Sequence, residues 1–206
     1  LIEALFVPAS IVFFLCFMIV FGMVVYYGRS HEPKVQQIPL LRTIFTFVVF
    51  GGTFLAQIFS AIVLFNEQYD HDYGYAWVSC RGVFIFVGVA LTAWLFVSKQ
   101  NAKYLNQVFL AKNKRVYGFV AMFVVFNPNV VPMLPWLKTP TTEMTMGYPN
   151  MKIFYLATFL SVLETLVLTS ISTAFAVNER KLFSQSIMEQ FEFSFAISFT
   201  FMNGLV

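Results

Sequence analysis

The sequence predicts an all-α membrane protein, a polytopic bundle whose helices cross a bilayer several times. Of its 206 residues, 59% are hydrophobic and only 11% are charged, whereas a soluble domain carries about 25% charged residues. The apolar stretches are continuous and do not alternate with the period of two that β-barrel strands show. The 27 phenylalanines exceed what the core of a soluble domain of this size needs, and a lipid-facing surface accounts for the excess.

The clearest span lies between Arg81 and Lys99, which flank a continuous apolar run. On a helix that rises 1.5 Å per residue, the two cations lie about 27 Å apart. That distance is close to the hydrocarbon thickness of a bilayer, roughly 30 Å. A basic segment without acidic residues follows from Lys99 to Arg115, and it indicates the cytoplasmic side.

Six spans are expected, and they form one transmembrane domain over residues 1–206. They cover residues 4–28, 40–65, 77–98, 116–137, 151–177 and 183–206. The chain starts without Met and its last apolar run stops at Val206, so we expect it to be part of a longer protein with a seventh span.

The charges of the connections predict the orientation. The first, third and fifth connections hold most of the thirteen lysines and arginines, whereas the second holds only acidic residues and the fourth is weakly charged. Because basic connections stay in the cytoplasm, the N-terminus is expected outside and the odd-numbered connections inside.

The fourth span, residues 116–137, has an irregular outer half. Asn127-Pro128-Asn129 and then Pro132 and Pro135 interrupt it, and each proline removes a backbone donor and clashes with the preceding turn. Two interpretations stay open: a helix that ends near Phe126 and passes into an outer connection, or a kink at a binding site.

Three polar residues within the spans are candidate ligand-binding residues: Gln57, Arg81 and Glu164. Ionisable groups inside a membrane usually face the interior of a bundle and mark a functional site. Glu164 near the bilayer centre is expected to be protonated, paired with a cation, or exposed to a hydrated cavity. The alternative to a functional role is a carboxyl group bonded to a neighbouring helix for packing alone.

Charged residues at the predicted inner face form a second candidate site, for coupling to a cytoplasmic partner. Lys99 lies at about the same depth as Glu189 and Glu192, and a contact between them would form a latch that separating helices could break. The alternative is that all three extend to water. The remaining candidates are the cations of the inner connections: Lys103, Lys112, Lys114, Arg115, Arg180 and Lys181.

The sequence shows no catalytic set, no metal-binding motif and no phosphate-binding loop, so we expect neither an enzyme nor a bound metal or cofactor. The small net charge of +3 comes from cations sorted by connection, and it does not indicate a nucleic-acid partner. A channel filter or the paired interrupted helices of a transporter are not apparent either.

Three stretches of the sequence resemble seven-helix signalling proteins. HEPKVQQIPLLRTIFTFVVFGGTFLA is similar to the first loop and second helix of class C receptors, of the metabotropic glutamate and GABA-B type. SCR at the start of the third span, with a lysine at its far end, resembles both that class and plant-type seven-helix proteins with a regulator-of-G-protein-signalling domain. FSQSIMEQFEFSFAISFTF resembles the start of their sixth helix. Residues 140–150 lack the cysteine that in class C receptors would pair with Cys80, which favours the plant-type proteins or a divergent receptor of another lineage.

The resemblance implies a receptor-like protein, of the plasma membrane, that opens a cytoplasmic crevice and signals to a G protein or an attached signalling domain. Membrane lipid is the other expected partner. The alternatives are a non-catalytic membrane subunit that contacts other subunits of a larger complex, and a component of a transporter or channel.

Overall fold

The computed structural model describes residues 2–65, 72–138 and 148–178, and in this part of the chain every regular element is a helix. Four of the helices are long and apolar enough to cross a membrane. The elements in chain order are α1 (Ile2–Ser30), α2 (Leu40–Leu64), α3 (Asp72–Val97), α4 (Lys99–Ala102), α5 (Gln107–Lys112), α6 (Lys114–Phe126), the 3-10 helix η1 (Pro128–Met133) and α7 (Met151–Asn178).

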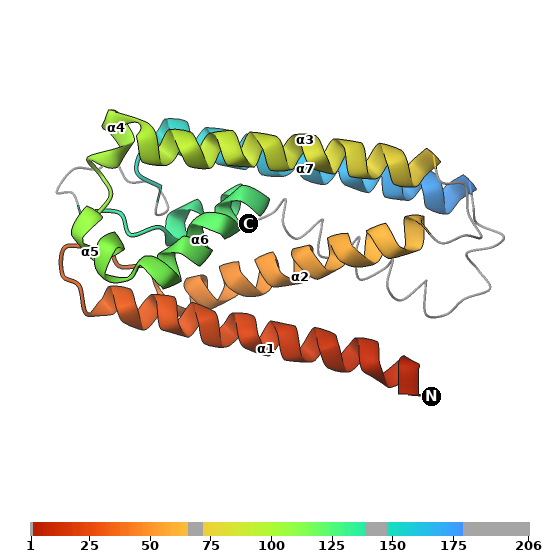
Figure 1. The fold of residues 1–206 in the computed structure, drawn as a ribbon, viewed down its shortest axis with the longest axis horizontal. Helices are drawn as coiled ribbons and strands as arrows, with labels where there is room; N and C mark the ends of the chain where they lie inside the picture. Colours follow the sequence, from red (N-terminus) through yellow and green to blue (C-terminus); the bar gives the residue numbers. More distant parts are fainter. Residues whose placement is uncertain (1, 66–71, 139–147, 179–206) are drawn as a thin grey trace.

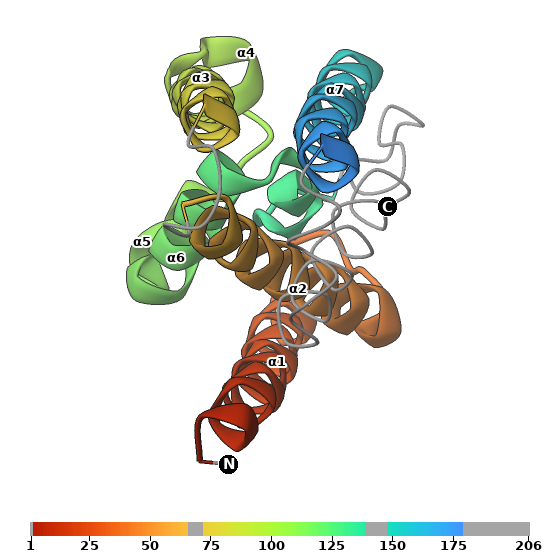
Figure 2. The ribbon, with the colours of Figure 1, turned by 90° about the vertical axis from the view of Figure 1, so that its right-hand side faces the viewer.

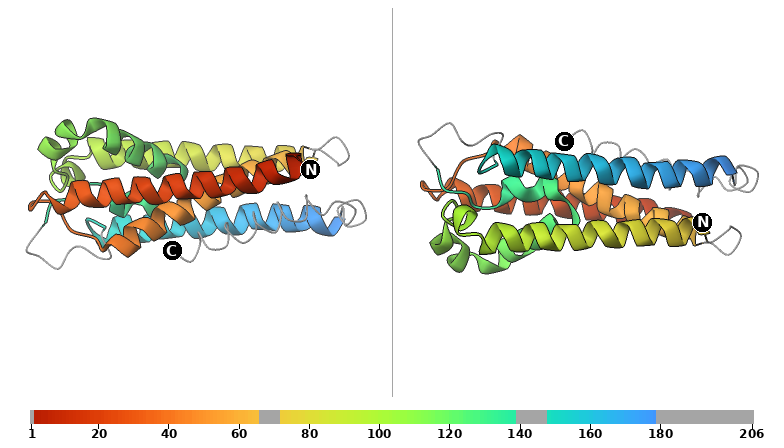
Figure 3. Two further views of the ribbon diagram at one scale, coloured as in Figure 1. Left: turned by 90° about the horizontal axis from the view of Figure 1, so that it is seen from below. Right: turned by 90° about the horizontal axis from the view of Figure 1, so that it is seen from above.

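The long helices form two pairs, with α1 against α2 and α3 against α7 (Figures 1 and 2). Within each pair the two helices run in opposite directions (Figure 1). The α1–α2 connection, α4, α5 and the start of α7 lie together at one end of the bundle, as the two views in Figure 3 show. We call this end of the bundle the basic end. The other end, where α3 begins and α7 stops, is called the opposite end.

Asparagine side chains determine where three of the shorter turns begin. The side-chain oxygens of Asn106, Asn127 and Asn150 accept hydrogen bonds at 2.9–3.0 Å from backbone N–H groups two or three residues further on. An N-terminal turn leaves its first N–H groups without helical partners, and an asparagine oxygen satisfies one of them. These residues therefore start α5, η1 and α7.

Residues 114–137 enter the bundle and return to the end from which they came, and we call them the re-entrant segment. α6 starts at the basic end and stops at Phe126, because Pro128 has no N–H to continue the helix. The chain then turns through η1 and runs back in extended form (Figure 1).

Backbone hydrogen bonds hold residues 136–138, the returning end of this segment, at the basic end. Leu137 donates to the carbonyl of Tyr104 at 2.6 Å, and Lys138 donates to the carbonyl of Lys34 at 2.8 Å. Gln36 donates to the carbonyl of Trp136 at 2.8 Å. The returning end of the re-entrant segment is thus tied to the connections that follow α1 and α3.

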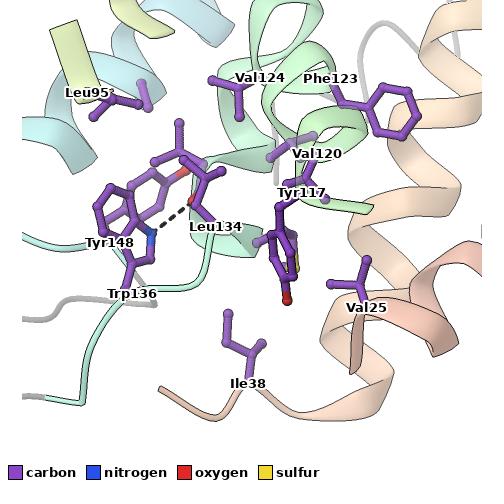
Figure 4. Close-up of a cluster of buried hydrophobic side chains, with 14 of the residues drawn as sticks. Val25, Ile38, Leu95, Tyr117, Val120, Phe123, Val124, Leu134, Trp136 and Tyr148 are labelled. Carbon is purple, nitrogen blue, oxygen red and sulfur yellow. Dashed lines mark hydrogen bonds between the residues drawn. The ribbon is translucent and has the colours of Figure 1, made fainter. Parts of the chain in front are cut away.

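The main hydrophobic core surrounds the re-entrant segment rather than the interface between long helices (Figure 4). Leu134 and Trp136 are fully buried, and the indole Nε1 of Trp136 donates to the carbonyl of Val131 at 3.0 Å. Tyr148 and Leu95 close the core from the side of α3 and α7. Burial of this segment against both helix pairs connects the two pairs.

Long apolar helices occur where four of the six spans were predicted, and the fold is helical as expected. The prediction of a fourth span over residues 116–137 is corrected. α6 has 13 residues, too few to cross a bilayer, and the segment that follows it turns back. The helix ends at Phe126, as the first interpretation of its prolines expected, but neither interpretation included the return. The sixth predicted span, residues 183–206, lies outside the described residues.

The return also corrects the predicted placement of charges. Lys138 and Lys152 were assigned to an outer connection, but both lie at the basic end with the first and third connections. Arg81 apart, every lysine and arginine of the described residues lies at or close to this end. α7 ends at the opposite end, where Asn178 Nδ2 donates to the hydroxyl of Tyr73, so the chain leaves α7 away from the other basic connections. Arg180 and Lys181 themselves lie outside the described residues.

Candidate functional site

The inward faces of α2 and α7 mix buried polar and apolar side chains, whereas large apolar side chains are exposed on their outward faces. On α7, Ser161, Glu164, Thr165 and Ser172 are buried at helical spacing, and Leu166 on the outer face is 60% exposed. The buried polar residues of α2 are Thr43, Thr46, Thr53, Gln57 and Ser60. A soluble helix exposes a polar face instead, and hydroxyl and amide side chains between apolar helices are typical of helix contacts within lipid.

Glu164, half-way along α7, is the centre of a polar contact between the helix pairs. Its Oε1 accepts a hydrogen bond from Gln57 Nε2 of α2 at 3.2 Å and forms an ion pair with Arg81 Nη1 of α3. Glu164 is 4% exposed and Arg81 is 7% exposed. We call Gln57, Arg81 and Glu164 the polar network; it joins both helix pairs.

A second bond of Arg81 extends the network to the re-entrant segment. Arg81 Nη2 donates to the backbone carbonyl of Phe126 at 3.1 Å. Phe126 is the last residue of α6, and the last carbonyls of a helix have no partner within it. The C-terminal end of a helix also carries a partial negative charge, which a guanidinium group stabilises. Arg81 therefore compensates Glu164 and the end of α6 together.

The close approach of α3 and α6 depends on a glycine. A Cβ atom added to Gly88 would lie 2.0 Å from the carbonyl oxygen of Val125, a backbone atom that cannot move aside. Val124, the residue before Val125, and Val120, about one helical turn before Val124, belong to the main core. Gly88 thus brings the end of α6 near enough to α3 for Arg81 to reach Phe126.

Energetics make the polar network a candidate for conformational switching. Removing one partner of a buried ion pair leaves an uncompensated charge and costs about 3–5 kcal/mol, whereas an apolar replacement of both partners is often tolerated. A buried pair is therefore weak evidence for stability alone. The pair is a candidate switch, because a change in its protonation or geometry would remove its contribution to this arrangement of the helices.

The structure brings together all three residues that the sequence analysis selected as ligand-binding candidates: Gln57, Arg81 and Glu164. Of the states considered for Glu164, the structure shows the paired one. No ligand is needed to satisfy these groups, so a ligand-binding role stays a prediction.

Sequence analysis missed Arg29, which it treated as a connection residue. Arg29 is 2% exposed, and its Nη1 donates to the carbonyl of Pro132 at 3.1 Å while its Nη2 donates to the carbonyl of Gln36 at 2.7 Å. It fastens η1 to the α1–α2 connection. No sequence signal identifies this role, because both acceptors are backbone atoms.

The coupling candidates within the described residues all lie exposed at the basic end: Lys99, Lys103, Lys112, Lys114 and Arg115. The ammonium group of Lys103 lies 4.7 Å from the ring centre of Tyr104. Glu189 and Glu192 lie outside the described residues, and so the predicted latch with Lys99 stays a prediction.

A candidate metal site is absent from the described part of the chain. Its His, Cys, Asp and Glu residues form no group of three that could hold a metal ion. Cys16 and Cys80 form no disulfide.

No protein-family model, curated protein or solved structure matches this chain.

Proposed function

We propose that this chain is the membrane domain of a receptor-like protein that transmits a signal by moving its two helix pairs apart. The observation that carries the proposal is the polar network, which joins α2, α3, α7 and the end of α6 through Arg81 and Glu164. Ionisable groups at this depth in a membrane are costly, and they are typical of functional sites.

The contacts between the two helix pairs suggest how the pairs would move apart. At the basic end the re-entrant segment packs against both pairs and is tied by backbone bonds to two connections. Nearer the opposite end, the polar network and a small apolar cluster around Trp77 and Leu168 join α2 to α3 and α7. Breaking the Arg81–Glu164 pair would let the pairs rotate about the re-entrant segment, and such bistable packing is how small local changes become domain movements.

Sidedness supports a cytoplasmic partner at the basic end. Cations gather there in the described residues, and basic connections are retained in the cytoplasm. α1 begins at the opposite end, which would place the N-terminus outside. The exposed cations from Lys99 to Arg115 would then face a G protein or an attached signalling domain. The proposal concerns signalling and not the seven-helix layout, which would need a crossing where the re-entrant segment lies.

The test uses the full chain in lipid nanodiscs with spin labels on the outward faces of α2 and α7. Glu164→Gln, which keeps the shape but removes the charge, should lengthen the label distance and change nucleotide exchange on an added heterotrimeric G protein. Thr173→Val is the control, because that hydroxyl is exposed and bonds only within α7. Unchanged distances and unchanged exchange in Glu164→Gln would contradict the proposal.

A second candidate is a transport component, and the re-entrant segment favours it. Helices that stop inside the membrane, with their ends near charged groups, form the substrate sites of many transporters. α6 stops in this way beside Arg81. Flux of ions through liposomes containing the full chain, reduced by Arg81→Met, would support transport over signalling.

A further inference from the structure

A groove of about 500 Å³ lies between α1 and α6 with α2 behind it, on the other side of α6 from the polar network. Its volume falls in the range of small-molecule sites, about 300–1,000 Å³. Apolar side chains line it throughout, except that Arg115 lines one end. No sequence motif or comparison assigns a role to it.

The dimensions of the groove match one leaflet of a bilayer. Its α6 wall is the stripe Arg115, Phe119, Met122 and Phe126, which recurs at the spacing of one helix face. At 1.5 Å per residue, this stripe is about 16 Å long. Half of a roughly 30 Å hydrocarbon core is about 15 Å.

The charge of the groove is placed where a lipid headgroup would be. Arg115 is exposed at the basic end, and the exposed Lys112 and Lys114 lie beside it in sequence. Phe126 closes the deep end, half-way into the bundle. A cation at the mouth of an apolar slot fits a molecule with an anionic head and one extended hydrocarbon chain, and basic sites between membrane helices bind anionic lipid headgroups.

We propose that this groove holds one acyl chain of an anionic phospholipid, with its phosphate bound to Arg115. The chain lies along α6, between Phe119 and the α1 residues Phe17 and Val24. The lipid adds contacts along the groove to the direct contact that α1 and α6 make through Phe21 and Phe123, whose ring centroids lie 5.5 Å apart. This inference does not depend on the signalling proposal.

Binding is measured by native mass spectrometry of the full chain in detergent, with phosphatidylglycerol and phosphatidylcholine of identical acyl chains. One phosphatidylglycerol should be retained in preference to phosphatidylcholine. Arg115→Gln should weaken phosphatidylglycerol binding about fivefold, the factor expected for one basic residue near an anionic headgroup. Arg115→Lys should keep most of the phosphatidylglycerol binding, because the positive charge remains. Inorganic phosphate should not compete, because it lacks an acyl chain.

Two matched controls separate the groove from ordinary surface lipid. Val24→Trp fills the groove and should weaken binding of both lipids, whereas Val12→Trp, on a part of α1 that does not line the groove, should not. Lys114→Gln removes a neighbouring cation outside the groove and should have a smaller effect than Arg115→Gln. Equal effects of the two charge variants, unchanged binding in Val24→Trp, or no retained lipid would each overturn the proposal.

Discussion

Arg81 of α3 donates a hydrogen bond to the backbone carbonyl of Phe126, the last residue of α6, at 3.1 Å. The same guanidinium group pairs with Glu164 of α7. One side chain therefore satisfies a carboxyl group and the end of a helix that stops inside the bundle. Without Arg81, both negative partners would be buried and uncompensated, which links the fold of the re-entrant segment to the proposed switch.

A double-mutant cycle measures this coupling. Arg81→Met and Glu164→Leu should each lower the free energy of unfolding by about 3–5 kcal/mol, because each leaves a buried charge without its partner. The double variant should lose less than the sum of the two, since neither charge then remains. Unfolding in mixed detergent micelles gives the four free energies, and additive losses would show that the pair is not coupled.

The glycine contact between α3 and α6 gives a second prediction. Gly88→Ala should destabilise the protein by about 1–3 kcal/mol, the usual cost of overpacking, because the new Cβ would meet the Val125 carbonyl. Gly82→Ala on the same helix is the control. Nothing lies within 4 Å of its Cβ position, so its higher helix propensity should leave stability equal or up to about 1 kcal/mol greater. Thermal unfolding compares the two, and equal shifts would contradict the close contact.

The return of the re-entrant segment is tested by the side from which cysteines react. In a background with Cys16 and Cys80 replaced by alanine, Lys34→Cys and Lys138→Cys should react with an impermeant maleimide from the same side. Asp72→Cys should react from the other side. Reaction of Lys138→Cys together with Asp72→Cys would mean that residues 116–137 cross the membrane after all. The side shared by Lys34→Cys also tests whether the basic end is cytoplasmic.

Arg29 should be required for the position of η1. Arg29→Lys keeps the charge but cannot donate to Pro132 and Gln36 together, because its single ammonium group lacks the planar fork of arginine. We expect the free energy of unfolding to fall by at least about 1 kcal/mol per missing charged hydrogen bond. The fluorescence emission of Trp136 should also change, because Trp136 packs in one core with the η1 residues Val130 and Val131. Lys34→Gln, an exposed cation of the same connection, should change neither. An unaltered Arg29→Lys protein would show that its bonds are dispensable.

The buried side chain of Tyr148 should make the folded protein less stable at high pH. Burial raises the pKa of Tyr148 to about 12, and the charge of Arg42 lowers it by a smaller amount. Because the pKa is raised in the folded state, the neutral phenol contributes stability that is fully present below pH 10 and is lost as the pH rises toward 12. Tyr148→Phe keeps the ring contact with Phe154 and should lose less stability over this range. Unfolding followed at pH 9, 10.5 and 11.5 compares the two proteins, and parallel curves would contradict the prediction.

Sequence alone determined the parts of this protein that follow from local composition. Apolar runs longer than about 20 residues can satisfy their backbone groups in lipid only as helices, so α1, α2, α3 and α7 were located correctly. The same reasoning selected Gln57, Arg81 and Glu164, because polar side chains in apolar helices avoid lipid by pairing with one another inside the bundle.

Tertiary structure alone decided the path of the chain between α3 and α7. Hydropathy counts apolar residues in 116–137 but does not distinguish those that face lipid from those that face other helices, and Val131, Leu134 and Trp136 are fully buried. The segment turns back because the backbone acceptors it exposes are met by donors far away in sequence, Arg29 for Pro132 and Arg81 for Phe126. A carbonyl group is the same in every residue, and only the folded arrangement determines which side chain binds it.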